Sequence, residues 1–153
     1  MSLLKLLALD EEDLTIISSH LQDAVMLVGE MAYIPSQQRF AAVLNRFDWE
    51  KASRKGADGG YDRRRSALRF DRVRSAKLKH LSPSARDQVL SLLAISFEPG
   101  DAPSGFITLT FSGDATIRLE VECIEAELKD IGLAWRAKSK PRHPGDKPGG
   151  SGS

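Results

Sequence analysis

The sequence predicts a mainly β domain, in which about seven antiparallel strands are accompanied by two helices. Residues 24–49 and 89–121 alternate apolar and polar side chains or are almost wholly apolar, and turns rich in Pro, Gly, Ser or Asp interrupt both stretches. Short turns of this kind join antiparallel neighbours. The 153 residues are 41% hydrophobic and 28% charged, which excludes a collagenous, transmembrane or wholly disordered chain.

The first elements are a short strand and a helix. Residues 3–9 form an apolar run that predicts a buried strand. Asp10 then suits a helix N-cap, because its carboxylate accepts hydrogen bonds from first-turn N–H groups, and three acids follow it. An apolar stripe recurs at helical spacing in Leu14, Ile17 and Leu21. We therefore expect a helix over residues 11–21.

A long β-hairpin is predicted over residues 24–49, with its turn at residues 35–38. One face of the first strand carries Val25, Leu27, Gly29, Met31 and Tyr33. One face of the second strand carries Ala41, Val43, Phe47 and Trp49. Gly29 within a strand indicates a bulge or the close approach of another segment.

The next strand is predicted over residues 63–81 and is rich in basic residues. Leu68 and Phe70 point inward, whereas Val73 falls out of register, so we expect a bulge at residues 71–72. A meander follows at residues 89–97, 106–111 and 116–121. Its first strand is almost all apolar, which predicts that both of its faces are covered.

The last element is predicted to be a helix over residues 122–131. Ile124, Leu128 and Ile131 fall at i, i+4 and i+7, and Gly132 suits the residue after a helix end. Seven antiparallel strands closed at one corner by a C-terminal helix are the arrangement of pleckstrin-homology-like barrels. An α+β layered sheet with two helices on one face is the alternative.

Composition divides the chain into one domain and a tail. Residues 1–135 are expected to form the globular domain, with a mobile loop at residues 53–60. Residues 136–153 are basic and rich in Pro, Gly and Ser, which predicts a disordered tail. The N-terminus lacks a basic region before its short apolar run, so we expect no signal peptide or membrane span and a cytoplasmic location.

No recognisable catalytic or metal-binding motif occurs in the sequence. Cys123 is the single cysteine, so an intramolecular disulfide is excluded, and its acidic neighbours disfavour a reactive thiolate. The histidines His20, His80 and His143 lack ligand spacing, and the acids at residues 10–13 are explained by helix capping. We expect no cofactor and no metal, and the balance leans against an enzyme.

Several strings together resemble a small alphaproteobacterial family of unknown function. They are Tyr33-Ile34-Pro35, Arg39-Phe40, Asn45-Arg46-Phe47-x-Trp49-Glu50, Arg63-Arg64-Arg65 before Leu68-x-Phe70, Leu92-Leu93-Ala94-Ile95 and Ile117-Arg118-Leu119-x-Val121-Glu122-Cys123-Ile124. The resemblance covers most of residues 3–135. It implies no activity and supplies no catalytic residues.

Charge is distributed in blocks, although the net charge is only +1. Residues 63–81 carry +7, between flanks of −4 and −6, and residues 136–153 carry +4. The candidate partner-binding residues are Arg63, Arg64, Arg65, Arg69, Arg72, Arg74, Lys77 and Lys79. Guanidinium groups on a rigid strand suit phosphate or an acidic protein. The alternative is structural, because acids of the flanks would pair with these residues across strands and charge would protect the strand from aggregation.

A second candidate site lies at the end of the predicted hairpin. Polar and aromatic side chains there could line a pocket: Arg39, Asn45, Arg46, Asp48 and Trp49. Arg46 and Asp48 also fit a simple ion pair on one strand face.

The sequence therefore favours a non-enzymatic binding or scaffold domain for an acidic protein or a phosphate-bearing partner. A nucleic-acid-binding accessory protein is the alternative, although aromatic residues are not interleaved with the basic run. An enzyme without a recognisable motif is a third, less favoured hypothesis.

Overall fold

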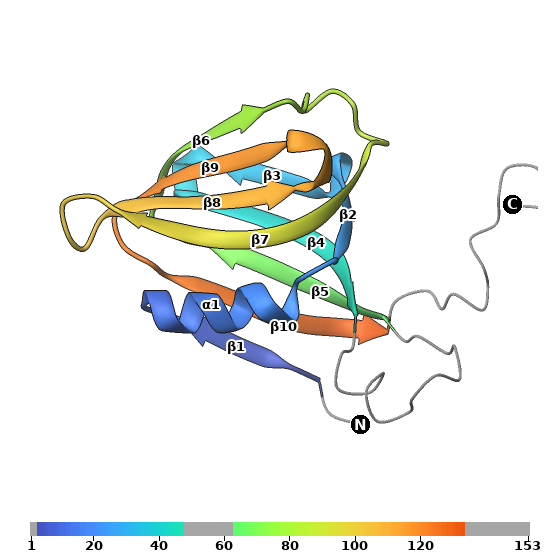
Figure 1. The fold of residues 1–153 in the computed structure, drawn as a ribbon, viewed down its shortest axis with the longest axis horizontal. Coiled ribbons are helices and arrows are strands. Elements are labelled where there is room, and N and C mark those ends of the chain that lie inside the picture. The colour runs from blue at the N-terminus through green and yellow to red at the C-terminus, as the bar shows by residue number, and fades with distance from the viewer. Residues whose placement is uncertain (1–2, 48–62, 134–153) are drawn as a thin grey trace, which may run out of the picture.

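The computed structural model describes residues 3–47 and 63–133. The elements, in chain order, are β1 (Lys5–Ala8), α1 (Glu11–His20), β2 (Val25–Leu27), β3 (Met31–Ile34), β4 (Arg39–Phe47), β5 (Arg63–Phe70), β6 (Val73–Lys79), β7 (Val89–Pro99), β8 (Gly105–Phe111), β9 (Thr116–Val121) and β10 (Ala126–Leu133). Neighbouring strands follow the order β1-β10-β5-β4-β2-β7-β8-β9-β6, and β3 also pairs with β4 (Figure 1). All of these pairings are antiparallel, as predicted.

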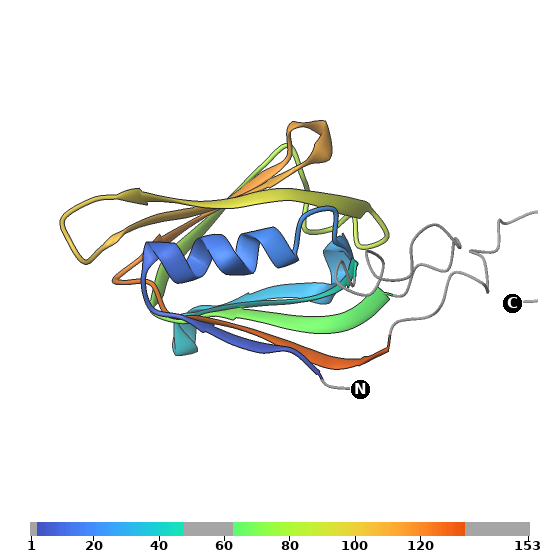
Figure 2. The same cartoon turned by 60° about the horizontal axis from the view of Figure 1, so that its bottom comes forward.

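The strands form two facing layers, with α1 between them at one side (Figure 2). One layer contains β6, β7, β8 and β9, and the other contains β1, β3, β4, β5 and β10. Strand β2 joins the layers, because it pairs with both β4 and β7. The end strands β1 and β6 do not pair with each other, so the sheet is open and the predicted closed barrel is wrong.

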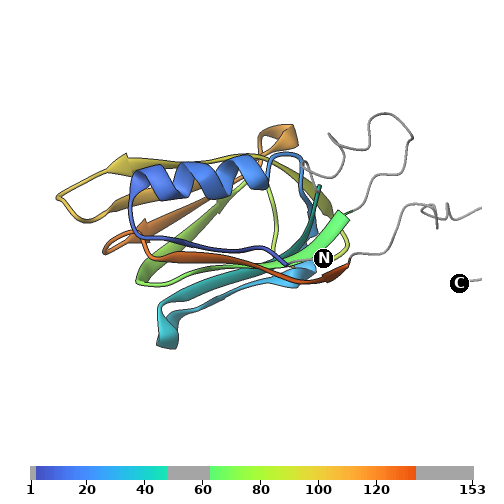
Figure 3. The ribbon, with the colours of Figure 1, turned by 90° about the horizontal axis from the view of Figure 1, so that it is seen from below.

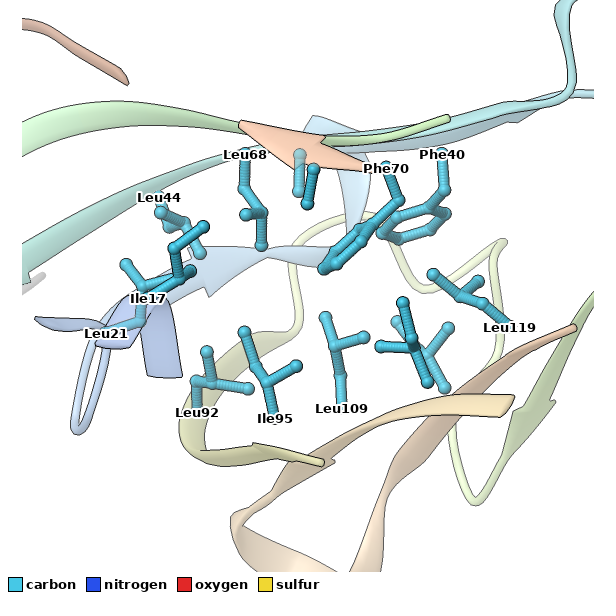
Figure 4. Packing of buried hydrophobic residues seen from close by; sticks show 14 of the residues in the cluster. Ile17, Leu21, Phe40, Leu44, Leu68, Phe70, Leu92, Ile95, Leu109 and Leu119 are labelled. Atoms are coloured by element: carbon cyan, nitrogen blue, oxygen red, sulfur yellow. The ribbon is translucent and has the colours of Figure 1, made fainter. Parts of the chain in front are cut away.

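Apolar side chains from both layers and from α1 fill the space between the layers (Figure 4). The largest fully buried side chains are Phe40, Phe70, Phe111, Leu14, Ile17, Leu21, Leu44, Leu68, Leu92, Ile107, Leu109 and Ile117. The rings of Phe40 and Phe70 lie 6.5 Å apart and come from neighbouring strands. Burial of this apolar area is the main stabilising contribution to the fold.

Helix α1 confirms the prediction for the first helix. The side chain of Asp10 accepts a hydrogen bond from the backbone N–H of Asp13 at 2.8 Å, which caps the N-terminus. Leu14 and Ile17 are buried, and α1 contacts both β1 and β7. Figure 3 shows β1 beside β10, with α1 above them in that view.

The predicted hairpin at residues 24–49 is confirmed only near its turn. Strands β3 and β4 pair around a 3-10 turn at Pro35–Gln37. Before β3, however, a 3-10 turn at Val28–Glu30 interrupts the chain. A Cβ at Gly29 would lie 3.1 Å from the Arg86 carbonyl oxygen, so the predicted close approach at this glycine is confirmed.

The buried face of β4 is opposite to the face that the sequence pattern singled out. Phe40, Ala42, Leu44 and Arg46 are buried, whereas Ala41, Val43, Asn45 and Phe47 are only partly covered. The pattern was misleading because an arginine occupies one of the four inward positions.

The basic run forms two strands, β5 and β6, rather than one strand with a bulge. Leu68 and Phe70 point inward as predicted, but the chain turns at Arg72, which has a positive φ of 61°. The partner strands turn with it: the Asp71 N–H donates to the Glu125 carbonyl at 2.9 Å, and the Glu122 N–H donates to the Arg72 carbonyl at 3.0 Å. Strands β5–β6 and β9–β10 therefore form one bent ribbon that passes from one layer to the other.

The predicted C-terminal helix over residues 122–131 is wrong, because this segment contains strand β10. Ile124, Ala126, Leu128 and Asp130 are buried, which is the alternation of a strand. The apolar residues also matched a helical spacing, and the acid at the fourth buried position concealed the strand pattern. Gly132 follows a register shift in the pairing of β10 with β5 and does not end a helix.

The meander of β7, β8 and β9 is confirmed. The prediction that both faces of its first strand are covered is wrong, since Val89 and Leu93 are 61% and 47% exposed. Helix α1 contacts β7, and the Ser18 hydroxyl accepts a hydrogen bond from the Ile95 N–H at 2.9 Å.

Some predicted features lie outside the described residues, namely the loop at residues 53–60 and the tail at residues 136–153. The part of the chain that the structure describes contains no helix long and apolar enough to cross a membrane.

Candidate binding surface

Strand β5 separates its basic residues onto two faces. Arg63, Arg65 and Arg69 are half-buried on the outer face of the sheet, whereas Arg64 lies on the inner face and is only 4% exposed. Burial makes Arg64 unavailable to a partner, so its place among the partner-binding candidates is not supported by its position. This alternation follows directly from the two-residue period of a strand.

Arg69 is at the centre of an ion-pair network on the outer face. Its Nε donates to Asp71 Oδ2 at 2.8 Å, and its Nη1 donates to Glu127 Oε1 at 2.7 Å. The other carboxylate oxygen of Asp71 accepts from Arg39 Nε at 2.8 Å, and Lys5 lies 3.8 Å from Glu127. Two acids thus neutralise basic residues from three strands.

The pKa values in this network follow from these contacts. Burial acts to raise the pKa of Asp71, but hydrogen bonds from Arg39 and Arg69 outweigh burial and hold the pKa below its usual range. The hydrogen bond to Asp71, together with the charge of Glu127, raises the pKa of Arg69. Both members of the Arg69–Asp71 pair therefore stay charged at neutral pH.

The two outer arginines before Arg69 also have partners. Arg65 Nη2 donates to Glu30 Oε2 at 3.0 Å. The guanidinium carbon of Arg63 lies 4.1 Å from the centre of the Phe47 ring, and its Nη1 donates to the Asn45 carbonyl at 3.3 Å. Burial lowers the pKa of Arg63, with the charge of Asp23 acting in the opposite direction.

Acidic residues between Glu120 and Glu125 surround the basic residues at the bend between β5 and β6. Arg72 Nε donates to Glu125 Oε1 at 3.3 Å, and this hydrogen bond is the main reason that the pKa of Arg72 is raised. Arg74 lies 3.8 Å from Glu120 and 3.7 Å from Glu122. These pairs are exposed, so each contributes little to stability.

A buried polar cluster lies on the inner face of the layer that contains β4, β5 and β10. Arg46 donates to both carboxylate oxygens of Asp130, at 2.9 and 2.8 Å. The carboxylate also accepts from the Ser66 hydroxyl at 2.7 Å and from the Leu4 N–H at 3.0 Å. Burial acts to raise the pKa of Asp130, but these hydrogen bonds, that of Arg46 above all, lower it overall.

The second predicted site is not assembled as a pocket. Arg39 and Arg46 lie at opposite ends of β4, where Arg39 pairs with Asp71 and Arg46 with Asp130. Asn45 lies on the other face from Arg46, and its buried Oδ1 has no hydrogen-bond partner among the described residues. Asp48 and Trp49 lie outside the described residues, as does any ion pair between Asp48 and Arg46.

Lys77 and Lys79 have no ion pair among the described residues. Both are exposed on β6, where Lys77 faces Arg118 in the register with β9. Arg118 carries its own partners, since it lies 3.1 Å from Glu98 and 4.1 Å from the centre of the Phe106 ring. Arg118 was not among the predicted site residues, because it joins the basic run only through the pairing of β6 with β9.

Cys123 is half-buried in the connection between β9 and β10 rather than at the start of a helix. No group of three or more His, Cys, Asp or Glu residues within residues 3–47 and 63–133 is placed to hold a metal ion.

The comparisons with known proteins place the chain in one family. The model of DUF2948, described as a protein of unknown function, matches residues 4–143, and the chain belongs to this family. The match agrees with the resemblance found from the sequence, and it carries no source organism, activity or partner. Neither curated proteins nor solved structures gave a match.

Proposed function

We propose that the protein is a non-enzymatic binding or scaffold domain that engages an acidic protein or a phosphate-bearing partner through β6. The observation that carries this proposal is the contrast between β5 and β6. The outer arginines of β5 have acidic, aromatic or carbonyl partners, whereas Lys77 and Lys79 on β6 have no ion pair among the described residues. Charge that the fold does not neutralise remains available to a partner.

This contrast limits the proposed binding surface to β6. Arg65, Arg69, Arg72 and Arg74 lie within 4.0 Å of carboxylates of the same chain, so an external anion would compete with these acids. The lysines meet no such competition in the described part of the chain. We therefore take Lys77 and Lys79 as the centre of the site and Arg74 as its neighbour.

Nucleic acid fits this surface less well than a small acidic patch. A nucleic-acid site gains affinity from many unneutralised cations along the phosphate backbone, and most of the candidate arginines are paired. The expected cytoplasmic location is part of the same proposal, since a chain with a single cysteine is not built on disulfides.

The proposal is tested by capture of partners from a cell extract at low and at high salt. Wild-type protein is compared with Lys77→Gln/Lys79→Gln and with the control Lys5→Gln/Lys129→Gln. The control removes two lysines that face each other across β1 and β10 on the other layer. We expect an acidic or phosphorylated partner that is captured at low salt and lost with the β6 variant only. Equal capture by all three proteins would contradict a site on β6.

A further inference from the structure

Strand β6 is an open edge of the sheet for most of its length. It pairs with β9 on one side and stands at the end of the strand order, along the upper border of Figure 1. At its first residue, the backbone makes hydrogen bonds to other segments: the Val73 N–H donates to the Gln38 carbonyl at 2.9 Å, and the Val73 carbonyl accepts from the Tyr33 hydroxyl at 3.1 Å. From Arg74 to Lys79, no described strand pairs with the other side of β6.

An edge strand offers a row of backbone donors and acceptors that an extended peptide can use. The other end of the strand order, β1, is four residues long, whereas β6 has seven residues. Strand β6 therefore gives a longer template for pairing. Main-chain hydrogen bonds of this kind supply affinity, and side chains at alternate positions supply specificity.

Charge on the two faces of β6 defines the peptide that fits. Lys77 and Lys79 are two residues apart, so they share the exposed outer face and lie about 7 Å from each other along the strand. Ala76 and Leu78 point to the other face, where they pack partly buried against the core. An added strand with acids at alternate positions would place these acids opposite the lysines.

We propose that β6 binds an extended acidic peptide segment of another protein as an additional strand. The acids of the segment, spaced two residues apart, lie opposite Lys77 and Lys79. The intervening residues are small or β-branched and cover Ala76 and Leu78. This inference rests on the proposed function, and it specifies both the class of partner and the backbone mode of binding.

The first experiment measures binding of a defined probe by titration calorimetry. The probe is a nine-residue peptide of alternating glutamate and threonine, acetylated and amidated at its ends. We expect binding that weakens about two- to thirtyfold in Lys77→Gln/Lys79→Gln, because two cross-strand ion pairs are removed. The control Lys5→Gln/Lys129→Gln binds as the wild type does. Absence of probe binding to the wild type would overturn the inference.

The second experiment separates strand addition from simple charge attraction. Two further probes carry methyl groups on alternate backbone nitrogens, in the two possible phases. In one phase methylation removes the N–H groups that face β6, and in the other it removes those that face away. We expect one methylated probe to lose binding while the other retains it, and the backbone amides of β6 to gain protection from hydrogen exchange when the unmodified probe binds.

The outcomes distinguish the inference from the proposed function. If both methylated probes bind equally and no amide of β6 gains protection, strand addition is wrong, while lysine-dependent binding still supports an acidic partner. If no probe binds and replacement of Lys77 and Lys79 by valine causes only self-association, the lysines serve to protect the edge. The inference is then overturned. A lysate partner captured through Arg65 and Arg69 instead would contradict the proposed function as well.

Discussion

The guanidinium group of Arg46 and the carboxylate of Asp130 form a buried two-point ion pair. The two residues are 84 positions apart in the chain, and their side chains are only 7% and 1% exposed. Ser66 and the backbone of Leu4 complete the hydrogen bonds of the carboxylate. The pair thereby connects β4, β5 and β10 with the residue that precedes β1, all on the core side of one layer.

Removal of one partner from this pair is expected to destabilise the fold strongly. In Asp130→Ala the guanidinium of Arg46 remains buried without its counter-charge, so the free energy of unfolding should fall by about 3–5 kcal/mol. The variant Arg46→Met/Asp130→Leu, which replaces both charges by apolar groups, should lose much less. Urea unfolding followed by circular dichroism measures the difference. Equal losses in the two variants would show that the pair does not act as a unit.

Stability is expected to decrease in acid because of Asp71 and Asp130. Each has a folded-state pKa below its usual value, so each contributes stability that is present above about pH 4 and lost as the pH falls through the folded pKa. Urea unfolding midpoints measured between about pH 5 and pH 2 should fall steadily. The variant Asp71→Asn should show a shallower decrease than the wild type. An identical decrease in both proteins would remove Asp71 from this account.

The acids on the outer face are expected to suppress binding of polyanions. In Asp71→Asn/Glu127→Gln, the guanidinium groups of Arg39 and Arg69 lose their counter-charges. This variant should elute from a heparin column at a higher salt concentration than the wild type. The control Asp101→Asn/Asp114→Asn changes net charge equally in turns beside β8. If the control is retained as strongly, net charge rather than local pairing determines retention.

Two glycines near the β7–β8 turn are expected to respond differently to alanine. A Cβ at Gly105 would lie 2.5 Å from the Glu98 carbonyl oxygen and 2.5 Å from the Phe97 ring. Gly105→Ala should therefore cost about 1–3 kcal/mol of unfolding free energy through overpacking. At Gly100 the nearest atom lies 3.5 Å away, so Gly100→Ala should change stability little. Thermal unfolding compares the two, and similar melting temperatures would contradict the close packing at Gly105.

Sequence patterns predicted several of the elements whose inward residues are apolar. The first helix, the meander strands β8 and β9 and the turn between β3 and β4 are confirmed. Patterns were misleading where the inward face contains charge. Arg46 concealed the buried face of β4, and Asp130 made β10 resemble a helix. Neither residue reveals its burial locally, because its partner lies in a distant segment.

For the candidate surface, the sequence located the basic residues, but it could not show which of them pair with acids of the same chain. The acidic flanks indicated that pairing was available, and the ion pairs of Arg65, Arg69, Arg72 and Arg74 use acids from these flanks. The order of the strands in the sheet determines which basic residues lie close to a carboxylate. Lys77 lies opposite Arg118 of β9, and β6 has no second neighbouring strand from Arg74 to Lys79 among the described residues.

The bent ribbon of β5–β6 and β9–β10 has a consequence for how the chain folds. Each of its two segments supplies a strand to both layers, and 36 residues lie between Lys79 and Thr116, where the two segments end and begin. The layer of β6 to β9 comes from the continuous stretch 73–121, whereas the other layer takes strands from both sides of that stretch. Because the two layers share both segments of the ribbon, neither layer is expected to persist when the other unfolds. Unfolding of the bend in this ribbon should open both layers in a single cooperative transition. Refolding should be slow, because a long loop must close before the two segments can pair.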